Sequence, residues 1–402
     1  MMKPRILALS YLFPNRAYPN FGIFVLNRLK AVQKYCNITV IAPIPKFPFM
    51  EGFERFRGYS RIPTRDIIQG LDVAHPRFPV IPRFIKWWDS FAYWAAVAPL
   101  AHRLRNQVDL VDVHWVYPDI LAAFMISKLY KKKFIITVRG VEALHINENS
   151  FRKKIIDFLL LKADHVIALS QHLRSLIETI GVPTRKISII LNGTDNHHFQ
   201  LMDQNQCREQ LGLPKGIPII VSVGSLLLSK GHDLLINAVS KLSDRYNVEL
   251  YIIGGTGSEG DDRAAIERLM NSLALSNVHL VGRKPHEELA LWYNAADLFC
   301  LASRSEGCPN VVMEALACGT PVVVTNVGAI VDIVEKEEEG HIVEAGKIDE
   351  LEMALRKGLE RTWDRRLISR RGQRRTWDEC ARQVLEVYNL LLIGNYEANI
   401  TK

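Results

Sequence analysis

Two glutamates near residue 310 could do chemistry together. Glu306 and Glu314 are eight positions apart, separated by Gly-Cys-Pro-Asn and the start of an apolar run. Gly307 lets a ligand approach the backbone and Pro309 suits a first helical turn, so we expect a helix to begin here. Amide groups at a helix start attract phosphate, and carboxylates accept hydrogen bonds from sugar hydroxyls. The segment therefore suits a nucleotide sugar.

An ordinary surface helix is the alternative, with Glu306 as a cap and Glu314 solvated. The surroundings favour a site. Apolar runs at 298–302 and 322–325 flank the segment, and Gly319 ends the predicted helix. A helix between two apolar strands predicts a βαβ crossover, whose ligands bind at the carboxyl ends of the strands.

Residues 305–323 resemble the donor-site signature, a Glu-x7-Glu element, of the large retaining glycosyltransferase family four, which has the GT-B fold. The resemblance implies that Glu306 approaches the transferred sugar and that Glu314 holds the nucleotide ribose. It also implies that the intervening segment holds sugar and phosphate groups, through Gly307, Cys308, Pro309, Asn310 and Val311.

A lysine provides a candidate phosphate cation. Gly224 and Ser225 follow an apolar strand-like run, and Lys230 comes shortly after, at the expected start of a helix. A lysine there can neutralise a leaving diphosphate, although a surface lysine in a loop is the alternative. The spacing is similar to the family's Gly-x-Leu…Lys-Gly element. The family often has Arg where this chain has Ser225, so one of two usual phosphate cations is missing.

Three further positions are assigned to the donor by the resemblance. The Gly254-Gly255 turn is similar to the family's second glycine turn near the nucleotide. Arg283 falls where relatives hold the base. Gly22 is the remaining member of the paired glycines that relatives often have beside the donor phosphate.

Two strand ends in the first half resemble the acceptor-side loops of bacterial exopolysaccharide and teichuronic-acid-type members of the family. Many relatives carry His at the position of Arg139. An arginine offers a fixed cation to a phosphate or sugar, which suits a lipid-diphosphate acceptor, or it forms a structural salt bridge. His114 is either a substrate contact or a hydrogen-bonded buried histidine. We predict that His114, Arg139, Lys230 and Glu306 are catalytic and that the acceptor is bound by His114, Trp115, Tyr117, Arg139 and Glu142.

Two domains must position these residues, because 402 residues exceed the usual size of one hydrophobic core. Alternating strand-like and helix-like segments predict two Rossmann-like, doubly wound α/β domains facing a cleft. We expect the domains to cover residues 1–195 and 196–377. The resemblance implies that a last helix, 378–402, packs back on the first domain.

The charge is unevenly divided, with 28 Lys+Arg against 14 Asp+Glu in residues 1–195 and 23 against 29 in the remainder. The asymmetry indicates an anionic partner for the first half, and nucleic acid and a membrane surface are the candidates. Residues 46–105 mix basic and aromatic side chains, which suits a peripheral membrane contact or an ordinary core helix with a basic face. We expect an anionic membrane surface and not nucleic acid.

Three features that the sequence lacks predict where the protein is located in the cell. Six scattered cysteines and no signal peptide indicate a reducing, cytoplasmic setting. The longest apolar stretch is too short to cross a membrane. We therefore expect a protein at the cytoplasmic face of the membrane.

Together these features predict a retaining glycosyltransferase of cell-surface polysaccharide biosynthesis, which moves a sugar from a nucleoside-diphosphate sugar to a lipid-linked saccharide. The resemblance implies same-face attack, in which the leaving phosphate helps to deprotonate the acceptor. No Asp-x-Asp motif lies at a predicted cleft loop, so we expect neither a metal nor another cofactor. The alternatives are a non-catalytic subunit that binds a nucleotide sugar or glycolipid in a polysaccharide assembly complex, and a GT-B epimerase or phosphorylase.

Overall fold

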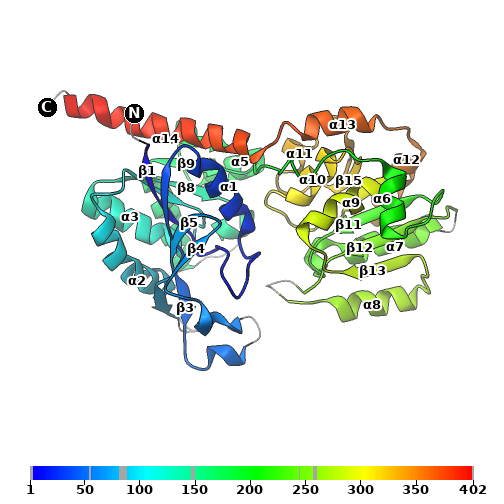
Figure 1. Ribbon diagram of the computed structural model, residues 1–402, viewed down its shortest axis with the longest axis horizontal. Helices are drawn as coiled ribbons and strands as arrows, with labels where there is room; N and C mark the ends of the chain where they lie inside the picture. Colours follow the sequence, from blue (N-terminus) through cyan, green and yellow to red (C-terminus); the bar gives the residue numbers. More distant parts are fainter. Residues whose placement is uncertain are drawn as a thin grey trace. The chain divides into compact units, whose positions relative to one another are not determined.

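The computed structural model describes residues 3–53, 56–80, 88–145, 150–243, 245–256 and 260–400, without the side chains of Glu142 and of residues 393–400. The chain forms two compact units (Figure 1). Unit 1 comprises residues 1–192 and 377–402, and unit 2 comprises residues 193–376. Each unit is built on a largely parallel β-sheet, which confirms the predicted α/β fold class.

The sheet of unit 1 has eight strands in the order β10-β9-β8-β7-β1-β2-β5-β4. All neighbours pair in parallel except β4, which runs antiparallel to β5. The central strands are mostly apolar because helices cover both faces of the sheet, and Asp112 on β7 is a buried exception. The strands are β1 (Arg5–Leu9), β2 (Asn37–Ile41), β4 (Arg65–Ile68), β5 (Leu71–Ala74), β7 (Leu110–Val113), β8 (Lys133–Val138), β9 (His165–Ala168) and β10 (Ile187–Ile189), and β3 (Ile44–Lys46) pairs separately with β6 (Arg77–Pro79).

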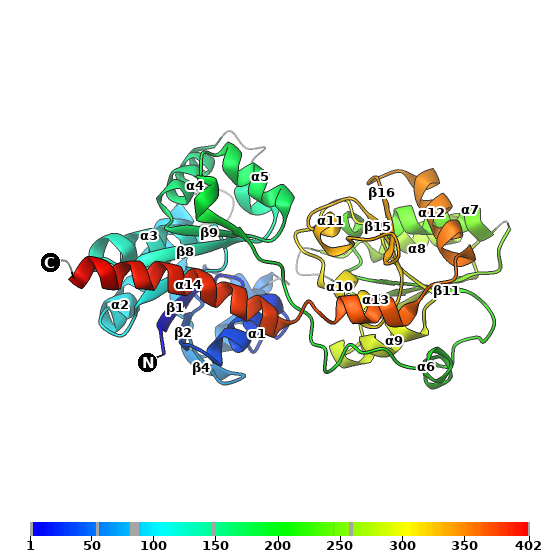
Figure 2. The same cartoon turned by 90° about the horizontal axis from the view of Figure 1, so that it is seen from above.

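The last helix of the chain belongs to unit 1. Its inner side buries Ala381, Val384 and Tyr388 in the core that also contains residues of the first helix. Figure 2 shows these two helices, α14 and α1, side by side. The helices of unit 1 are α1 (Ile23–Gln33), α2 (Trp88–Leu104), α3 (Asp119–Tyr130), α4 (Phe151–Lys162), α5 (Gln171–Thr179) and α14 (Trp377–Ile400).

The sheet of unit 2 has six parallel strands in the order β13-β12-β11-β14-β15-β16. The strands are β11 (Ile219–Val223), β12 (Glu249–Ile253), β13 (Val278–Gly282), β14 (Leu298–Leu301), β15 (Val322–Thr325) and β16 (Gly340–Val343). The helices are α6 (Gln204–Leu211), α7 (His232–Ser243), α8 (Arg263–Ser272), α9 (Leu289–Ala295), α10 (Asn310–Ala317), α11 (Ile330–Ile333), α12 (Ile348–Glu360) and α13 (Arg365–Gly372). Among the residues described in either unit, no helix combines the length and apolar content needed to cross a membrane.

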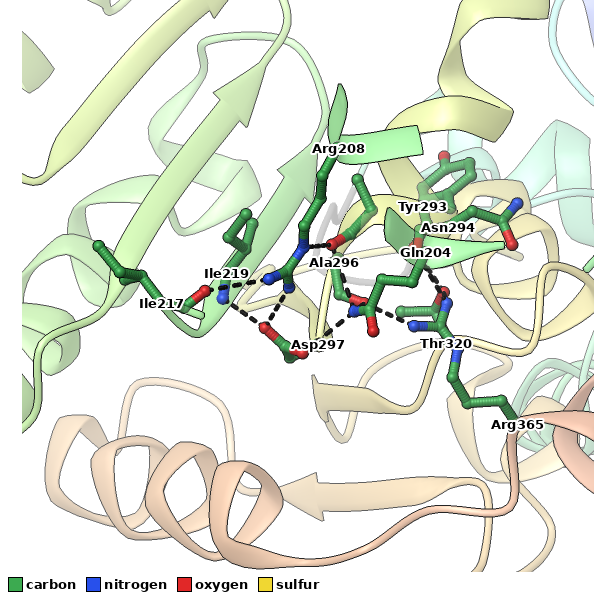
Figure 3. Close-up of polar contacts among 11 residues, drawn as sticks. Gln204, Arg208, Ile217, Ile219, Tyr293, Asn294, Ala296, Asp297, Thr320 and Arg365 are labelled. Carbon is green, nitrogen blue, oxygen red and sulfur yellow. Dashed lines mark hydrogen bonds and ion pairs between the residues drawn. The ribbon is translucent and has the colours of Figure 1, made fainter. Parts of the chain in front are cut away.

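The C-terminal turn of α9 is held by side chains from other elements (Figure 3). The last carbonyls of a helix lack partners within the helix. Here Thr320 donates to the Tyr293 carbonyl at 2.6 Å, Arg365 to that of Asn294 at 3.1 Å, Arg208 to that of Ala295 at 2.9 Å, and Gln204 and Arg365 both to that of Ala296 at 3.0 Å. These contacts fix the backbone at Tyr293, and its side chain reaches the candidate site.

Candidate functional site

Three glycine-containing turns lie together at the carboxyl ends of β11, β12 and β13. Backbone hydrogen bonds of 3.0 Å join them, from Gly224 to the Ile253 carbonyl, from Leu226 to the Gly255 carbonyl and from Gly254 to the Gly282 carbonyl. A Cβ atom at Gly254 would lie 1.7 Å from the Gly224 carbonyl oxygen, so only glycine fits there. Predicted donor residues from distant parts of the sequence, Gly224 and Gly255, are therefore neighbours.

Arg283 and Ser225 extend this group of turns. The Arg283 guanidinium donates to the Thr256 carbonyl at 2.7 Å. Ser225 accepts at its carbonyl from His232 Nε2 at 3.1 Å. Burial lowers the pKa of His232 to about 4, so its ring is neutral near pH 7 and supports the turn as a hydrogen-bond donor.

Lys230 and Glu306 are in direct contact. Lys230 Nζ lies 2.8 Å from Glu306 Oε1, and Ser303 Oγ donates to the same oxygen at 2.7 Å. The Lys230 side chain is 27% exposed and that of Glu306 is 10% exposed, so the pair lies at the surface of unit 2 without being fully solvated. The site thus places a cation directly against a carboxylate.

The backbone brings this pair together. Lys230 ends a short 3₁₀ turn, Leu228–Lys230, immediately before α7. Gly231 then has a φ of 69°, and a Cβ atom there would lie 1.8 Å from the Ala302 carbonyl oxygen. This close approach fixes the turn against the segment after β14, which carries Ser303 and Glu306. Sequence reasoning missed Ser303, although its place directly after β14 is a usable signal.

The segment between Glu306 and α10 is held from the side of β15. Ala329 donates its amide to the Gly307 carbonyl at 2.9 Å, and a Cβ atom at Gly328 would lie 2.4 Å from the Glu306 carbonyl oxygen. Pro309 stands at the N-cap of α10, one position before the first helical turn where it was predicted. A proline side chain has no group that could cap the amides that follow. Cys308, Asn310 and Val311 are half-buried around this helix start.

Glu314 lies on α10 with a side chain that is 7% exposed. Its Oε2 accepts from the Tyr293 hydroxyl at 2.9 Å, and its Oε1 lies 3.0 Å from His286 Nε2. A carboxylate only accepts, so Nε2 carries the proton. The hydrogen bond to Glu314 raises the pKa of His286, while burial opposes the change. Each oxygen of a carboxylate accepts more than one hydrogen bond, so Glu314 keeps capacity for a ligand hydroxyl.

His286 and Tyr293 were missed by the sequence reasoning. His286 is 52% exposed at its side chain, and its ring packs 5.0 Å from that of Phe199. It follows the Arg283-Lys284-Pro285 turn that was assigned to the base, and that position was the available signal. Tyr293 is buried on α9 and looks like any core aromatic in the sequence.

In unit 1 the predicted residues His114 and Arg139 form a buried pair. Arg139 donates to His114 Nδ1 and to the His114 carbonyl, both at 3.1 Å. A guanidinium cannot accept, so Nδ1 is unprotonated and the ring proton is on Nε2. That atom lies 3.3 Å from Asp112 Oδ2. Burial lowers the pKa of His114, so the ring is neutral. Nδ1 accepts from Arg139, whereas Nε2 lies near Asp112 without forming a hydrogen bond.

A residue from the other end of the chain completes this cluster. The Tyr388 hydroxyl on α14 donates to Asp112 Oδ2 at 2.5 Å. Burial alone would raise the pKa of Asp112, but its contacts with His114, Arg28 and Tyr388 lower it. Asp112 is therefore a buried carboxylate. We name Asp112, His114, Arg139 and Tyr388 the unit 1 polar cluster.

The remaining predicted positions are spread over unit 1. The Arg152 guanidinium lies 5.3 Å from the Tyr117 ring, and burial raises the pKa of the Tyr117 hydroxyl. Trp115 is half-buried beside His114 in the sequence. Gly22, before α1, has a φ of 70°, and a Cβ atom there would lie 2.5 Å from the Leu12 carbonyl oxygen, so the backbone itself requires glycine. The Glu142 side chain lies outside the described residues.

Two family models match the chain. Residues 18–198 match the model described as Glycosyltransferase Family 4, and residues 203–375 match that described as Glycosyl transferases group 1. A Bacillus subtilis (strain 168) protein, named as a teichuronic acid biosynthesis glycosyltransferase, TuaC, is 27% identical over 344 residues, which cover 83% of this chain and 84% of that protein.

Solved structures are similar over nearly the whole chain. Sucrose-phosphate synthase from Thermosynechococcus elongatus has a TM-score of 0.78 at 21% identity, covering 98% of this chain and 100% of that one. HepE from Anabaena, in complex with UDP, has a TM-score of 0.73 at 18% identity, covering 96% of this chain and 100% of that one. At these identities the likeness establishes the fold.

Proposed function

Because the chain belongs to glycosyltransferase family four and has the GT-B fold, we propose that it moves a sugar, with retention, from a nucleoside-diphosphate sugar to a lipid-linked saccharide. The chain is a glycosyltransferase. The proposal concerns its donor, its acceptor and the work of its residues.

The contact between Lys230 and Glu306 carries the proposal for the donor. Glu306 would accept from hydroxyls of the transferred sugar, and Lys230 would hold the diphosphate. A cation placed where the leaving group gains negative charge stabilises the transition state more than the ground state. Ser303, at 2.7 Å from Glu306, would orient the carboxylate. With Lys230 as the cation on the leaving group, we propose that transfer requires no divalent metal.

Glu314 would bind the ribose of the donor. Tyr293 and His286 hold its two oxygens, so the carboxylate is oriented before the nucleotide arrives. Such pre-organisation saves part of the ordering cost of binding. The Anabaena protein is named as a complex with UDP, which supports a nucleoside diphosphate as the ligand of these turns and makes UDP the first nucleotide to test.

The proposal for the acceptor rests on unit 1. The unprotonated nitrogen of His114, Nδ1, is occupied by Arg139, so we assign His114 the task of orienting Arg139 rather than of accepting a proton. Arg139 would then offer an immobile cation to an anionic acceptor, next to a loop that contains Trp115 and Tyr117. A lipid diphosphate has the required charge. The name of the Bacillus protein supports an acceptor in the synthesis of a cell-surface polysaccharide.

The direct test uses the purified chain with a panel of nucleotide sugars, first in thermal-shift measurements and then in transfer assays. A bound donor raises the melting temperature. Transfer is measured with a polyprenyl-diphosphate-linked monosaccharide as acceptor. We expect one donor to be transferred without added metal, and Glu306→Gln to lose transfer while the surface control Glu209→Gln retains it.

Three outcomes would contradict this function. Donor binding without transfer or hydrolysis would indicate a non-catalytic binding subunit, a role that the absence of arginine at Ser225 favours. Conversion of the donor without any acceptor would indicate an epimerase. Activity that depends on free phosphate would indicate a phosphorylase.

A further inference from the structure

Helix α4 (Phe151–Lys162) carries more apolar surface than the core of unit 1 uses. Ile156, Leu159 and Leu160 are buried on its inner side. Phe158 and Leu161 point away from them, with exposed fractions of 51% and 40%. A core-facing helix needs only one apolar stripe, so the outer apolar residues require a separate explanation.

The outer residues form one continuous face. Lys154, Phe158, Leu161 and Lys162 follow the spacing i, i+4, i+7 and i+8, which places side chains on the same side of a helix. The Lys162 ammonium lies 5.2 Å from the centre of the Phe158 ring. We call these four residues the α4 outer face.

Its charge is of one sign. Asp157 is the only acid in the sequence of α4, and Lys153 binds both of its oxygens at 2.5 Å. Asp157 follows Lys154 by three positions and precedes Leu161 by four, so it lies at the edge of the outer face. Helix α4 thus carries four basic residues, Arg152, Lys153, Lys154 and Lys162, against this one acid.

Helix α3 extends the same surface. The Phe124 ring meets the Phe158 ring edge to face, with centroids 6.2 Å apart. The Lys128 ammonium lies 5.6 Å from the centre of the Phe124 ring. Figure 2 shows α3 and α4 as neighbours in unit 1. Two helices thus present aromatic rings bordered by lysines.

We propose that the α4 outer face docks on an anionic lipid bilayer, with Phe158 and Leu161 at the level of the headgroups and the lysines against lipid phosphates. Aromatic and aliphatic side chains beside lysines are the composition of helices that lie in a membrane interface. An exposed apolar patch marks an interaction surface, and the excess of lysines favours an anionic partner.

The position of α4 links this surface to the acceptor. Arg152, at the start of the helix, lies 5.3 Å from the ring of Tyr117, in the predicted acceptor loop. Docking through α4 would therefore hold that loop close to the lipid surface. This consequence rests on the proposed lipid-linked acceptor, whereas the docking itself does not.

The sequence placed the membrane contact elsewhere, in residues 46–105. Of that segment, Phe49 and Phe53 are 91% and 56% exposed, and Trp88 and Phe91 are 42% and 43% exposed. Residues 54–55 and 81–87, which include Arg55 and the run from Phe84 to Trp87, lie outside the described residues. That contact stays a prediction, and the α4 outer face is a second, separate surface.

Vesicle flotation of the purified full chain tests the proposal. The vesicles contain phosphatidylcholine alone or with phosphatidylglycerol, and each set is measured at low and high salt. We expect the wild type to float only with the anionic vesicles, and less at high salt because surface charges are screened. The double variant Phe158→Ser/Leu161→Ser and the double variant Lys154→Glu/Lys162→Glu should each bind about tenfold less.

Matched controls separate this face from general stickiness. Ile67→Ser removes a 77% exposed side chain from strand β4, and Arg374→Glu reverses an exposed charge after α13 in unit 2. Both should float like the wild type. Thermal melting of every variant excludes loss of folding as the cause.

Several results would overturn the proposal. The wild type could fail to float with anionic vesicles, the α4 variants could float normally, or Arg374→Glu could lose binding equally. Absence of flotation together with a dimer that dissociates in Phe158→Ser/Leu161→Ser, seen by sedimentation, would assign the face to a second copy of the chain. Calorimetry with UDP tests the donor proposal separately. If the chain did not bind UDP, its flotation with anionic vesicles would still be expected.

Discussion

The two units hold their functional candidates in different ways. In unit 2, the side chains of Lys230, Glu306 and Glu314 are 27%, 10% and 7% exposed, and each is held by one or two contacts. In unit 1, Asp112 and His114 are completely buried and hold one another together with Arg139. The difference indicates that a polar side chain near a strand end does not by itself mark a ligand contact. Substitutions in unit 2 should affect binding and catalysis, whereas substitutions of Asp112 or Tyr388 in the unit 1 polar cluster should first affect stability.

The largest effect is expected for Asp112→Ala. This change removes the buried carboxylate that interacts with Arg28 and accepts the hydrogen bond of Tyr388, and loss of one partner of a buried charge pair costs about 3–5 kcal/mol of stability. Tyr388→Phe removes only the hydrogen bond and should cost about 1–3 kcal/mol. Chemical denaturation measures both. UDP affinity of the folded protein should not change in either variant.

If Asp112→Ala had the free energy of unfolding of the wild type, the unit 1 polar cluster would not stabilise unit 1, and the stated difference between the units would be wrong. Weaker UDP binding by folded Asp112→Ala would also contradict it, because Asp112 would then contribute to binding of the nucleotide. Tyr388→Phe tests the same cluster from the other end of the chain, because Tyr388 is 276 positions from Asp112 in the sequence.

Lys230→Met should have the next largest effect, on catalysis. Loss of a cation on the leaving group is expected to lower kcat about 100- to 1000-fold, as for other groups that stabilise transition-state charge. Stability should change little, because the lysine is partly exposed. Steady-state kinetics measure the effect. Lys241→Met is the control and should keep its kcat. It removes an exposed lysine of α7 that pairs with Asp349 on α12.

The comparison also explains what the sequence could predict. Glu306 and Glu314 belong to one contiguous segment, so their spacing carries the information. The strands that flank this segment, β14 and β15, are largely apolar runs, and the sequence indicated both, at 298–302 and 322–325. The β4–β5 hairpin was missed, because it lies in residues 46–105, where the apolar pattern is broken by aromatic and basic side chains.

Contacts between distant segments could not be predicted. Tyr388 reaches Asp112 only because α14 packs on α1, and no local pattern encodes that pairing. The same holds for Tyr293 and His286, which hold Glu314 from α9 and from the turn before it. A single sequence therefore left the role of His114 open, since the answer depends on which groups the fold brings around its ring.

Glu314→Ala should weaken binding of UDP by about 1–3 kcal/mol, the range for loss of a hydrogen bond to a charged group. Isothermal titration calorimetry measures the change. Tyr293→Phe keeps the carboxylate but removes one of its protein partners, so it should have a smaller effect. Unchanged affinity in Glu314→Ala would remove this glutamate from the ribose site and leave its contacts with Tyr293 and His286 as purely structural.

The smallest effect concerns pH. Glu314 raises the pKa of His286 above its ordinary value of 6.5, with smaller contributions from Glu287 and Asp195. A group whose pKa is raised by folding stabilises the protein fully below its unfolded pKa, and this contribution is lost as the pH rises through the folded pKa.

The His286 side chain is half-exposed, so solvent screening limits the contribution to under about 1 kcal/mol. We expect the free energy of unfolding of the wild type to exceed that of His286→Gln below about pH 6.5, and the difference to shrink as the pH rises. Denaturant titrations of both proteins across this range measure it. If the difference in free energy of unfolding stays constant or grows with pH, the His286–Glu314 contact acts as a neutral hydrogen bond or does not stabilise the protein. His286 would then resemble His114, the neutral histidine of the unit 1 polar cluster.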